Sequence, residues 1–172
     1  MGSSEYQIRQ GGGPVNQDAG RTGAAAPPEH WRYARHLESL AAVSGPSEAE
    51  AVATVLRDPD PVMAESAVVT HLDRRASRLM AEEAFPAWAQ AVGEAIGGRS
   101  FPARRLREWI LLRAITRGET WSRAELLAAS DWCQRTAAQS LHAEEALRLL
   151  ATGARTRRVR NTAVQRLLRR AA

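Results

Sequence analysis

One pattern of small and apolar residues occurs twice near the carboxyl end of the sequence, and it limits the fold more than any other feature. The first copy spans 133–141 and the second spans 159–167, a shift of 26 residues. Each copy follows a leucine pair, Leu126–Leu127 in one case and Leu149–Leu150 in the other. A repeated helix pair explains this pattern, because stacked units bury the same face of each copy. The matched residues are Cys133 and Val159, Thr136 and Thr162, Ala137 and Ala163, Gln139 and Gln165, and Leu141 and Leu167.

Apolar residues at helical spacing predict further helices, each bounded by proline, glycine or a capping residue. Pro86 is expected to begin a helix, because proline inside a helix costs about 3 kcal/mol. Ser77 is expected to cap a separate helix that carries Leu79 and Met80, and the first helix carries Trp31 at core spacing. The predicted helices include about 30–43, 47–56, 86–96, 102–117, 123–129, 132–141, 143–152 and 156–170.

Short polar motifs indicate where several of these helices begin. Asp60 is a good N-cap for a helix that starts at Pro61, because the first helical position needs no amide donor. Asp131 is expected to cap the helix over 132–141 in the same way. Two serine–glutamate pairs at a spacing of three predict capping boxes. These pairs are Ser47 with Glu50 and Ser122 with Glu125.

The turn Asp58-Pro59-Asp60-Pro61, placed between a leucine-ended helix and a helix with small residues, resembles a HEAT repeat. The later copies follow the same scheme, and Val159-Arg160 matches the valine–arginine pair common in the second HEAT helix. The resemblance covers about 47–74 and 121–170. It departs from the family at Met63 and Gln134, where arginine is usual. It implies an all-α fold, a short right-handed solenoid of about three to four antiparallel helix pairs of the HEAT or armadillo kind.

Composition divides the chain into a tail and one domain. Residues 1–29 contain few large apolar side chains, so they cannot bury enough surface to offset chain entropy and are predicted to be disordered. The helical-repeat domain then spans 30–172. All 24 basic residues are arginine and the net charge is +5. Seven arginines and no acid fall within 155–172, an asymmetry that suggests an anionic partner.

The last predicted helix is amphipathic and carries a basic face. Terminal repeats need a polar outer face, so this face is explained by a solubilising cap, by an anion-binding strip or by a membrane-surface helix. Arg160 falls near the apolar edge and is expected to bond within the stack. The candidate strip for an anion or a partner consists of Arg155, Arg157, Arg158, Arg166, Arg169 and Arg170.

No pattern in the sequence indicates a catalytic or metal site. The single cysteine, Cys133, excludes an internal disulfide and is expected to be a buried small hydrophobe. His142, Glu144 and Glu145 are too few to hold a metal, so we expect neither a metal nor a cofactor. The sequence shows neither a membrane-spanning run nor a signal pattern, which predicts a cytoplasmic protein with no membrane contact.

Three functions follow from these expectations. The first is a non-catalytic binding module that takes another protein, because stacked helix pairs form an extended binding surface. The second is nucleic-acid binding through the arginine-rich last helix. The third is an enzyme, since some HEAT-like proteins resemble DNA glycosylases that place acids and tryptophans against a damaged base. Asp131, Glu108 and the five tryptophans are compatible with that third function, but no motif of the family matches residue by residue.

Overall fold

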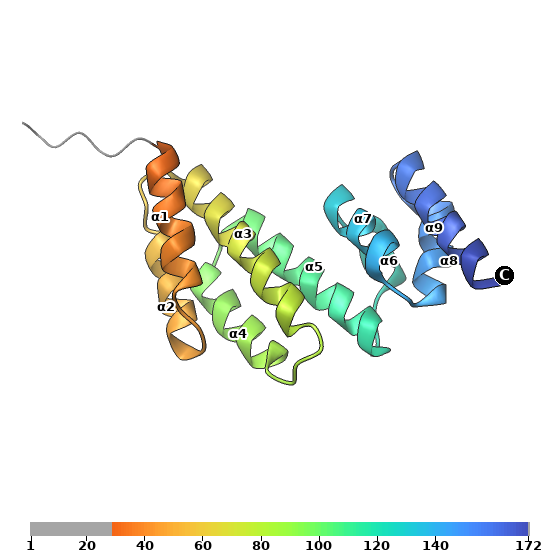
Figure 1. Cartoon of the computed structure of the whole chain (residues 1–172), viewed down its shortest axis with the longest axis horizontal. Coiled ribbons are helices and arrows are strands. Elements are labelled where there is room, and N and C mark those ends of the chain that lie inside the picture. The colour runs from red at the N-terminus through yellow and green to blue at the C-terminus, as the bar shows by residue number, and fades with distance from the viewer. Residues whose placement is uncertain (1–28, 172) are drawn as a thin grey trace, which may run out of the picture.

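The computed structural model of this protein describes residues 29–171, and in that range it contains helices and no strand. The predicted all-α class is therefore confirmed (Figure 1). Residues 1–28, which form nearly all of the predicted tail, lie outside the described part of the chain. The helices are α1 (Glu29–Ala41), α2 (Pro46–Val55), α3 (Pro61–Leu79), α4 (Phe85–Ile96), α5 (Ser100–Arg117), α6 (Arg123–Ala128), α7 (Asp131–Ser140), α8 (Glu144–Gly153) and α9 (Arg157–Ala171).

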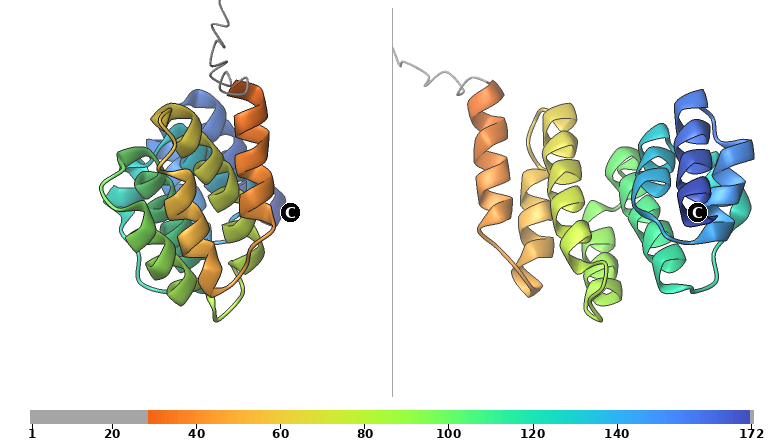
Figure 2. Two further views of the ribbon diagram at one scale, coloured as in Figure 1. Left: turned by 90° about the vertical axis from the view of Figure 1, so that its left-hand side faces the viewer. Right: turned by 45° about the vertical axis from the view of Figure 1, so that its right-hand side comes forward.

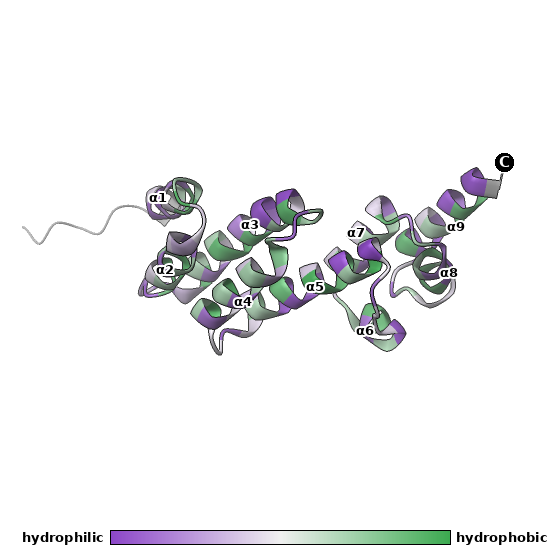
Figure 3. Ribbon diagram, turned by 90° about the horizontal axis from the view of Figure 1, so that it is seen from below, coloured by the Kyte–Doolittle hydropathy of each residue, from purple (hydrophilic) through white to green (hydrophobic). Residues whose placement is uncertain are grey.

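The helices are arranged in two rows along an elongated molecule. Each odd-numbered helix packs against the next odd-numbered one, from α1 through α3, α5 and α7 to α9. In the second row α2 packs against α4, and α6 against α8 (Figures 1 and 3). The described chain begins with α1 at one end of this array and finishes with α9 at the other (Figure 2).

Between the two rows lies a continuous apolar core. Leu72, Leu112 and Leu147 are at most 1% exposed, and each such side chain stabilises the fold by about 1.5–3 kcal/mol through burial. Ala137 and Ala163, the small residues matched across the two copies, are also fully buried, as predicted. Small side chains at these positions let α7, α8 and α9 approach closely.

Two of the predicted caps are confirmed. Asp60 accepts a hydrogen bond from the Met63 amide at 3.1 Å, and Ser122 accepts one from the Glu125 amide at 3.2 Å. Two others, at Ser47 and Asp131, are wrong by one or two residues. Pro46 begins α2 after Gly45, whose φ of 67° favours glycine, so Ser47 lies inside the helix.

At α7 the cap is Ser130 in place of Asp131. Its side chain accepts a hydrogen bond from the Cys133 amide at 3.2 Å, and Asp131 becomes the first helical residue.

The predicted break before Ser77 does not occur. Helix α3 runs without interruption to Leu79, and the Ser77 hydroxyl donates to the Arg74 carbonyl at 3.0 Å. Ala76 and Leu79 are buried and continue the apolar face that Leu72 belongs to, so tertiary packing extends the helix beyond the serine. Because α3 is continuous, Arg74, Arg75 and Arg78 all lie on one helix.

In each of the two later helix pairs, one side chain of the second helix bonds to carbonyl groups at the end of the first. The two side chains are Gln134 and Arg160. Gln134 is fully buried and donates to the Leu126 and Leu127 carbonyls at 3.1 and 2.8 Å. Its carbonyl oxygen accepts from the Arg155 amide at 2.9 Å. Arg160, 26 residues later, donates to the Ala154 carbonyl at 2.5 Å, so its predicted bond within the stack is confirmed. Glutamine in α7 thus performs the role that arginine performs in α9.

Helix α1 packs on α3, where Leu40 is fully buried, and it is also bonded to the turn after α2. Asp58, which follows α2, forms an ion pair with Arg32 at 3.2 Å and a hydrogen bond with His36 at 2.9 Å. The amide of Asp60 and these two partners of α1 lower the pKa of Asp58 against the opposing effect of burial. Trp31 was expected to face the core, but it is 65% exposed, and among the described residues α1 packs mainly against α2 and α3.

Candidate functional site

A buried carboxylate organises the end of the molecule that contains α1. Glu48 of α2 is 1% exposed. Its Oε1 atom accepts hydrogen bonds from His71 Nε2 and from the indole nitrogen of Trp88, both at 2.8 Å. Its Oε2 atom accepts from Arg75 Nε at 3.1 Å. The carboxylate therefore joins α2, α3 and α4.

These donors decide the charge of the carboxylate. Burial raises the pKa of Glu48, but the hydrogen bonds from His71, Trp88 and Arg75 outweigh burial, and the net pKa is lowered from its ordinary value of 4.5. Glu48 is therefore ionised at neutral pH. Because an ionised carboxylate has no hydrogen to donate, His71 carries its own hydrogen on Nε2.

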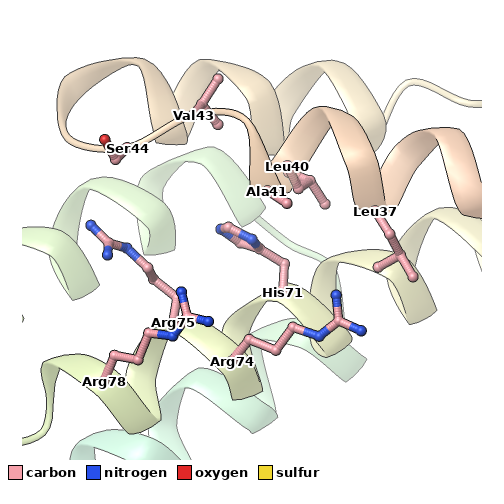
Figure 4. Close-up of a pocket in the computed structure, with 9 residues that line it drawn as sticks. All are labelled: Leu37, Leu40, Ala41, Val43, Ser44, His71, Arg74, Arg75 and Arg78. Atoms are coloured by element: carbon pink, nitrogen blue, oxygen red, sulfur yellow. The ribbon is translucent and has the colours of Figure 1, made fainter.

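Arg75 connects this buried group to a recess of about 240 Å³ between α1 and α3. Its Nε is bonded to Glu48, which leaves the two terminal nitrogens of the guanidinium available. Figure 4 shows Arg74, Arg75 and Arg78 extending from α3 toward α1 and toward the turn that holds Ser44. Leu37 and other apolar residues of α1 and the turn form the opposite wall.

The recess has an excess of positive charge. Three arginines line it, and none of its lining residues is acidic. Arg74 and Arg78 are exposed, and within residues 31–170 neither side chain forms an ion pair or a hydrogen bond. Glu48, which forms an ion pair with Arg75, is buried behind it. The recess can therefore receive an anion without first breaking an internal ion pair of Arg74 or Arg78.

A second carboxylate between α3 and α5 binds the same kinds of donor. Asp73 accepts from the indole nitrogen of Trp109 at 2.8 Å and from Arg105 at 2.5 Å. The Arg105 guanidinium lies 3.6 Å from the centre of the Trp132 ring, which is a stacked cation–π contact. Trp109 meets the edge of the same ring at a centroid distance of 5.3 Å. This arrangement braces α3, α5 and α7.

Glu108 and Cys133 lie near this second carboxylate. Glu108 is buried and accepts from the Ser130 amide at 2.9 Å, so it anchors the start of α7. Burial, helped by the charge of Glu108, raises the pKa of the Cys133 thiol to about 12. A thiol with this pKa stays protonated at neutral pH, so Cys133 acts as a buried small hydrophobe, as predicted.

Part of the predicted arginine strip is occupied by internal bonds. Arg166 donates to the Ala138 carbonyl at 3.2 Å and lies 3.4 Å from the ring of His142. Arg170 donates to the His142 carbonyl. These side chains therefore tie α9 to α7 and to the turn between α7 and α8.

The other four arginines of the predicted strip lie before α9, at its start and near its end. Arg155 precedes α9 and lies 3.8 Å from Asp131, with both side chains well exposed. Arg157 and Arg158 lie at the start of α9, and Arg169 lies near its end. Among the described residues these three form no ion pair or hydrogen bond through their side chains. The strip is thus two exposed groups at opposite ends of one helix, separated by about three turns.

The arginine recess was not predicted from the sequence. Arg74 and Arg78 are four residues apart, a spacing that places two side chains on the same helix face. That signal was hidden, because the sequence predicted a new helix at Ser77. Glu48 gave no separate signal, since its partners lie 23 to 40 residues away.

The described residues show no feature of a metal centre or a membrane span. They hold no group of three or more histidine, cysteine or acidic side chains that could bind a metal. In the same part of the chain, no helix combines the length and the apolar character that crossing a bilayer requires. Comparisons of the chain with protein-family models, with curated proteins and with solved structures give no match.

Proposed function

We propose that this chain is a non-catalytic helical-repeat module, a short right-handed solenoid of about three to four antiparallel helix pairs, that binds a partner protein. The two rows of alternating helices support this architecture. The equivalent bonds of Gln134 and Arg160, 26 residues apart, support the repeat. The resemblance to HEAT and armadillo repeats supplies the role, because such stacks bind partners along an extended surface.

The arginine recess is the part of this surface that we assign to the partner. The observation that carries the assignment is the lining itself, which contains three arginines and no acid. An acidic group of the partner would relieve the mutual repulsion of Arg74, Arg75 and Arg78 and would form charge-assisted hydrogen bonds with them. The apolar wall from α1 offers contact area to the residues beside that group.

Selection from a random peptide library tests the proposal. Wild-type protein is used to select binders, and the affinity of each labelled peptide is then measured by fluorescence polarisation. The R74Q/R78Q variant removes two charges from the recess. The R104Q/R107Q variant is the matched control, because both of these arginines are exposed on α5, outside the recess, and lack a side-chain partner among the described residues.

We expect selected peptides to contain an acidic residue and to lose about tenfold or more in affinity for R74Q/R78Q, with little change for the control. Equal losses in the two variants would remove the recess from the proposal and leave a general charge effect. A library that yields no binder would contradict the binding module itself.

Nucleic-acid binding through α9 is the second candidate function, and one observation favours it. Arg157, Arg158 and Arg169 are exposed and have no acidic partner among the described residues. A labelled duplex, measured at two salt concentrations, distinguishes this function from peptide binding. Phosphate contacts predict a slope of about −0.9 per neutralised phosphate, which a triple glutamine variant of these residues would reduce. Weak salt dependence would exclude it.

A further inference from the structure

From the charge and the donor geometry of the recess, we infer that its ligand is a phosphate monoester, carried by a phosphorylated side chain of the partner protein. This inference rests on the proposed function and specifies the group that the recess recognises. A carboxylate and a phosphate monoester differ in two properties that the recess can distinguish. One is the charge, and the other is the number of oxygen atoms available to the arginines.

The charge of the site favours the phosphate. Arg74, Arg75 and Arg78 supply three positive charges, and Glu48 behind Arg75 offsets one of them. The remaining excess is about two positive charges, which a phosphate monoester at neutral pH matches with its charge of about −1.5 to −2. A carboxylate carries one negative charge and leaves the other positive charge without a counterpart.

The donors of the site favour the same group. A phosphate monoester presents three terminal oxygens, one more than a carboxylate, so it can accept hydrogen bonds from more of the guanidinium groups that line the recess. A carboxylate presents two oxygens and satisfies at most two of these arginines with direct contacts. The planar guanidinium group suits phosphate oxygens, which it can bind through two parallel N–H bonds.

Glu48 prepares one of the donors before the ligand arrives. Its bond to Arg75 Nε at 3.1 Å fixes the guanidinium while the two terminal nitrogens stay free. Glu48 itself is fixed by His71 and Trp88. Since this bond already directs Arg75 before the ligand binds, less conformational entropy is lost on binding. Glu48 is therefore a positioning residue for the site.

The stem of the ligand has its own surface. Leu37, Leu40 and Val43 line the side of the recess that faces the arginines, and Ser44 lies at the turn (Figure 4). A volume of about 240 Å³ accommodates a phosphate group together with a short apolar or aromatic stem. The recess therefore offers charge to one end of the ligand and apolar contact to the other.

Three small ligands with the same ring test the inference: phenyl phosphate, phenyl sulfate and benzoate. Phenyl sulfate has three terminal oxygens but a single charge, and benzoate has two oxygens and a single charge. Each is titrated into ¹⁵N-labelled full-length protein at neutral pH, and the indole N–H signals are followed. Trp88 reports on the recess through Glu48, and Trp109 serves as the internal control through Asp73.

We expect phenyl phosphate to shift the Trp88 signal and to bind about tenfold more tightly than either of the other two ligands. The R74Q/R78Q variant should abolish that preference, and R104Q/R107Q should retain it. Inorganic phosphate, included as a fourth ligand, should bind more weakly than phenyl phosphate, because it lacks a stem. Binding of inorganic phosphate that equals phenyl phosphate would assign the recess to the free ion and overturn the role of the stem.

A peptide arm links this test to the partner protein. A binder selected from the library is made with glutamate and with phosphoserine at its acidic position, and phosphoserine is expected to bind about tenfold more tightly. Equal affinities would overturn the phosphate inference and leave the binding module in place. If neither peptides nor small ligands bind, the proposed function fails as well.

Discussion

Glu48 and Asp73 each accept a hydrogen bond from a tryptophan indole and from an arginine, yet the two carboxylates have different surroundings. Glu48 is 1% exposed and has a third donor, His71. The Asp73 side chain is 32% exposed and has two donors, Arg105 and Trp109. The same chemical unit therefore occurs once in the core and once near the surface.

The arginine of each unit shows what this difference means. Arg105 is stacked on Trp132 and lies 3.6 Å from Glu108 in addition to Asp73, so its charge is compensated within the fold. Within the described part of the chain, Arg75 has Glu48 as its only acidic partner, and it extends into a recess with two further arginines. The number of acids around the arginine, rather than the carboxylate–tryptophan pair, separates a structural brace from a candidate binding site.

The largest expected effect is loss of the buried carboxylate. Glu48→Ala removes the partner of Arg75 and His71 from the core and should lower the free energy of unfolding by about 3–5 kcal/mol. Asp73→Ala should cost only about 1 kcal/mol, because water can reach the groups left behind. Urea unfolding followed by circular dichroism measures both values. Similar losses for the two variants would mean that burial does not distinguish the units.

Removing the indole N–H group from each carboxylate is a milder test of the difference between Glu48 and Asp73. Trp88→Phe keeps most of the apolar surface but removes one hydrogen bond from an ionised, buried group, which should cost about 1.5–3 kcal/mol. Trp109→Phe should cost less, about 1 kcal/mol, since solvent can replace the lost donor of Asp73. The melting temperatures of the two variants, measured in one buffer, give the order. The reverse order would place the more important bond at Asp73.

Lowering the pH should remove the contribution of Glu48 to the free energy of unfolding over a limited range of pH. The pKa of Glu48 is lower in the folded protein than its ordinary value of 4.5, so the unfolded chain takes up this proton first. The stability from Glu48 is therefore complete above about pH 5 and is lost as the pH falls through the folded pKa. Unfolding free energies of wild type and Glu48→Gln, measured from pH 7 to pH 3, should converge in acid. A constant difference would show that Glu48 keeps one protonation state.

The smallest effect at neutral pH concerns Cys133, which lies beside the Asp73 unit. With a pKa raised to about 12, the native thiol should not react with iodoacetamide at pH 8, whereas it should react in denaturant. Because the unfolded thiol ionises near its ordinary value of 9, stability should decrease as the pH rises from 9 toward 12. Mass spectrometry of the alkylated protein measures the first effect. Rapid native labelling would show that α7 opens readily.

Local patterns predicted those parts of the molecule that depend on neighbours in the sequence. The helical class, the caps at Asp60 and Ser122 and the burial of Ala137 and Ala163 all follow from spacing within one or two helices. The bond of Arg160 to the preceding turn followed from the resemblance to a known repeat.

The candidate site could not be predicted in the same way. Glu48 meets His71 and Trp88 only because α2, α3 and α4 pack together, and no periodicity in the sequence reports that contact. For the same reason, the predicted strip contains arginines with internal bonds as well as arginines without them. Arg166 and Arg170 each reach a carbonyl group 28 residues earlier in the chain, in α7 and in the turn after it, which only the folded structure brings near.

The position of α1 at the end of the array links ligand binding to local opening of the helix. Elements at the end of a structure open at a lower free energy than central ones, and among the described residues α1 is the first helix of the array, packed on α3 and bonded to Asp58. The same helix supplies Leu37 and Leu40 to the recess. A ligand that needs this wall favours the closed state, so it should slow amide hydrogen exchange in α1 more than in α9. Ligand binding would then be measurable as slower amide exchange in α1, although none of the three arginines of the recess belongs to that helix.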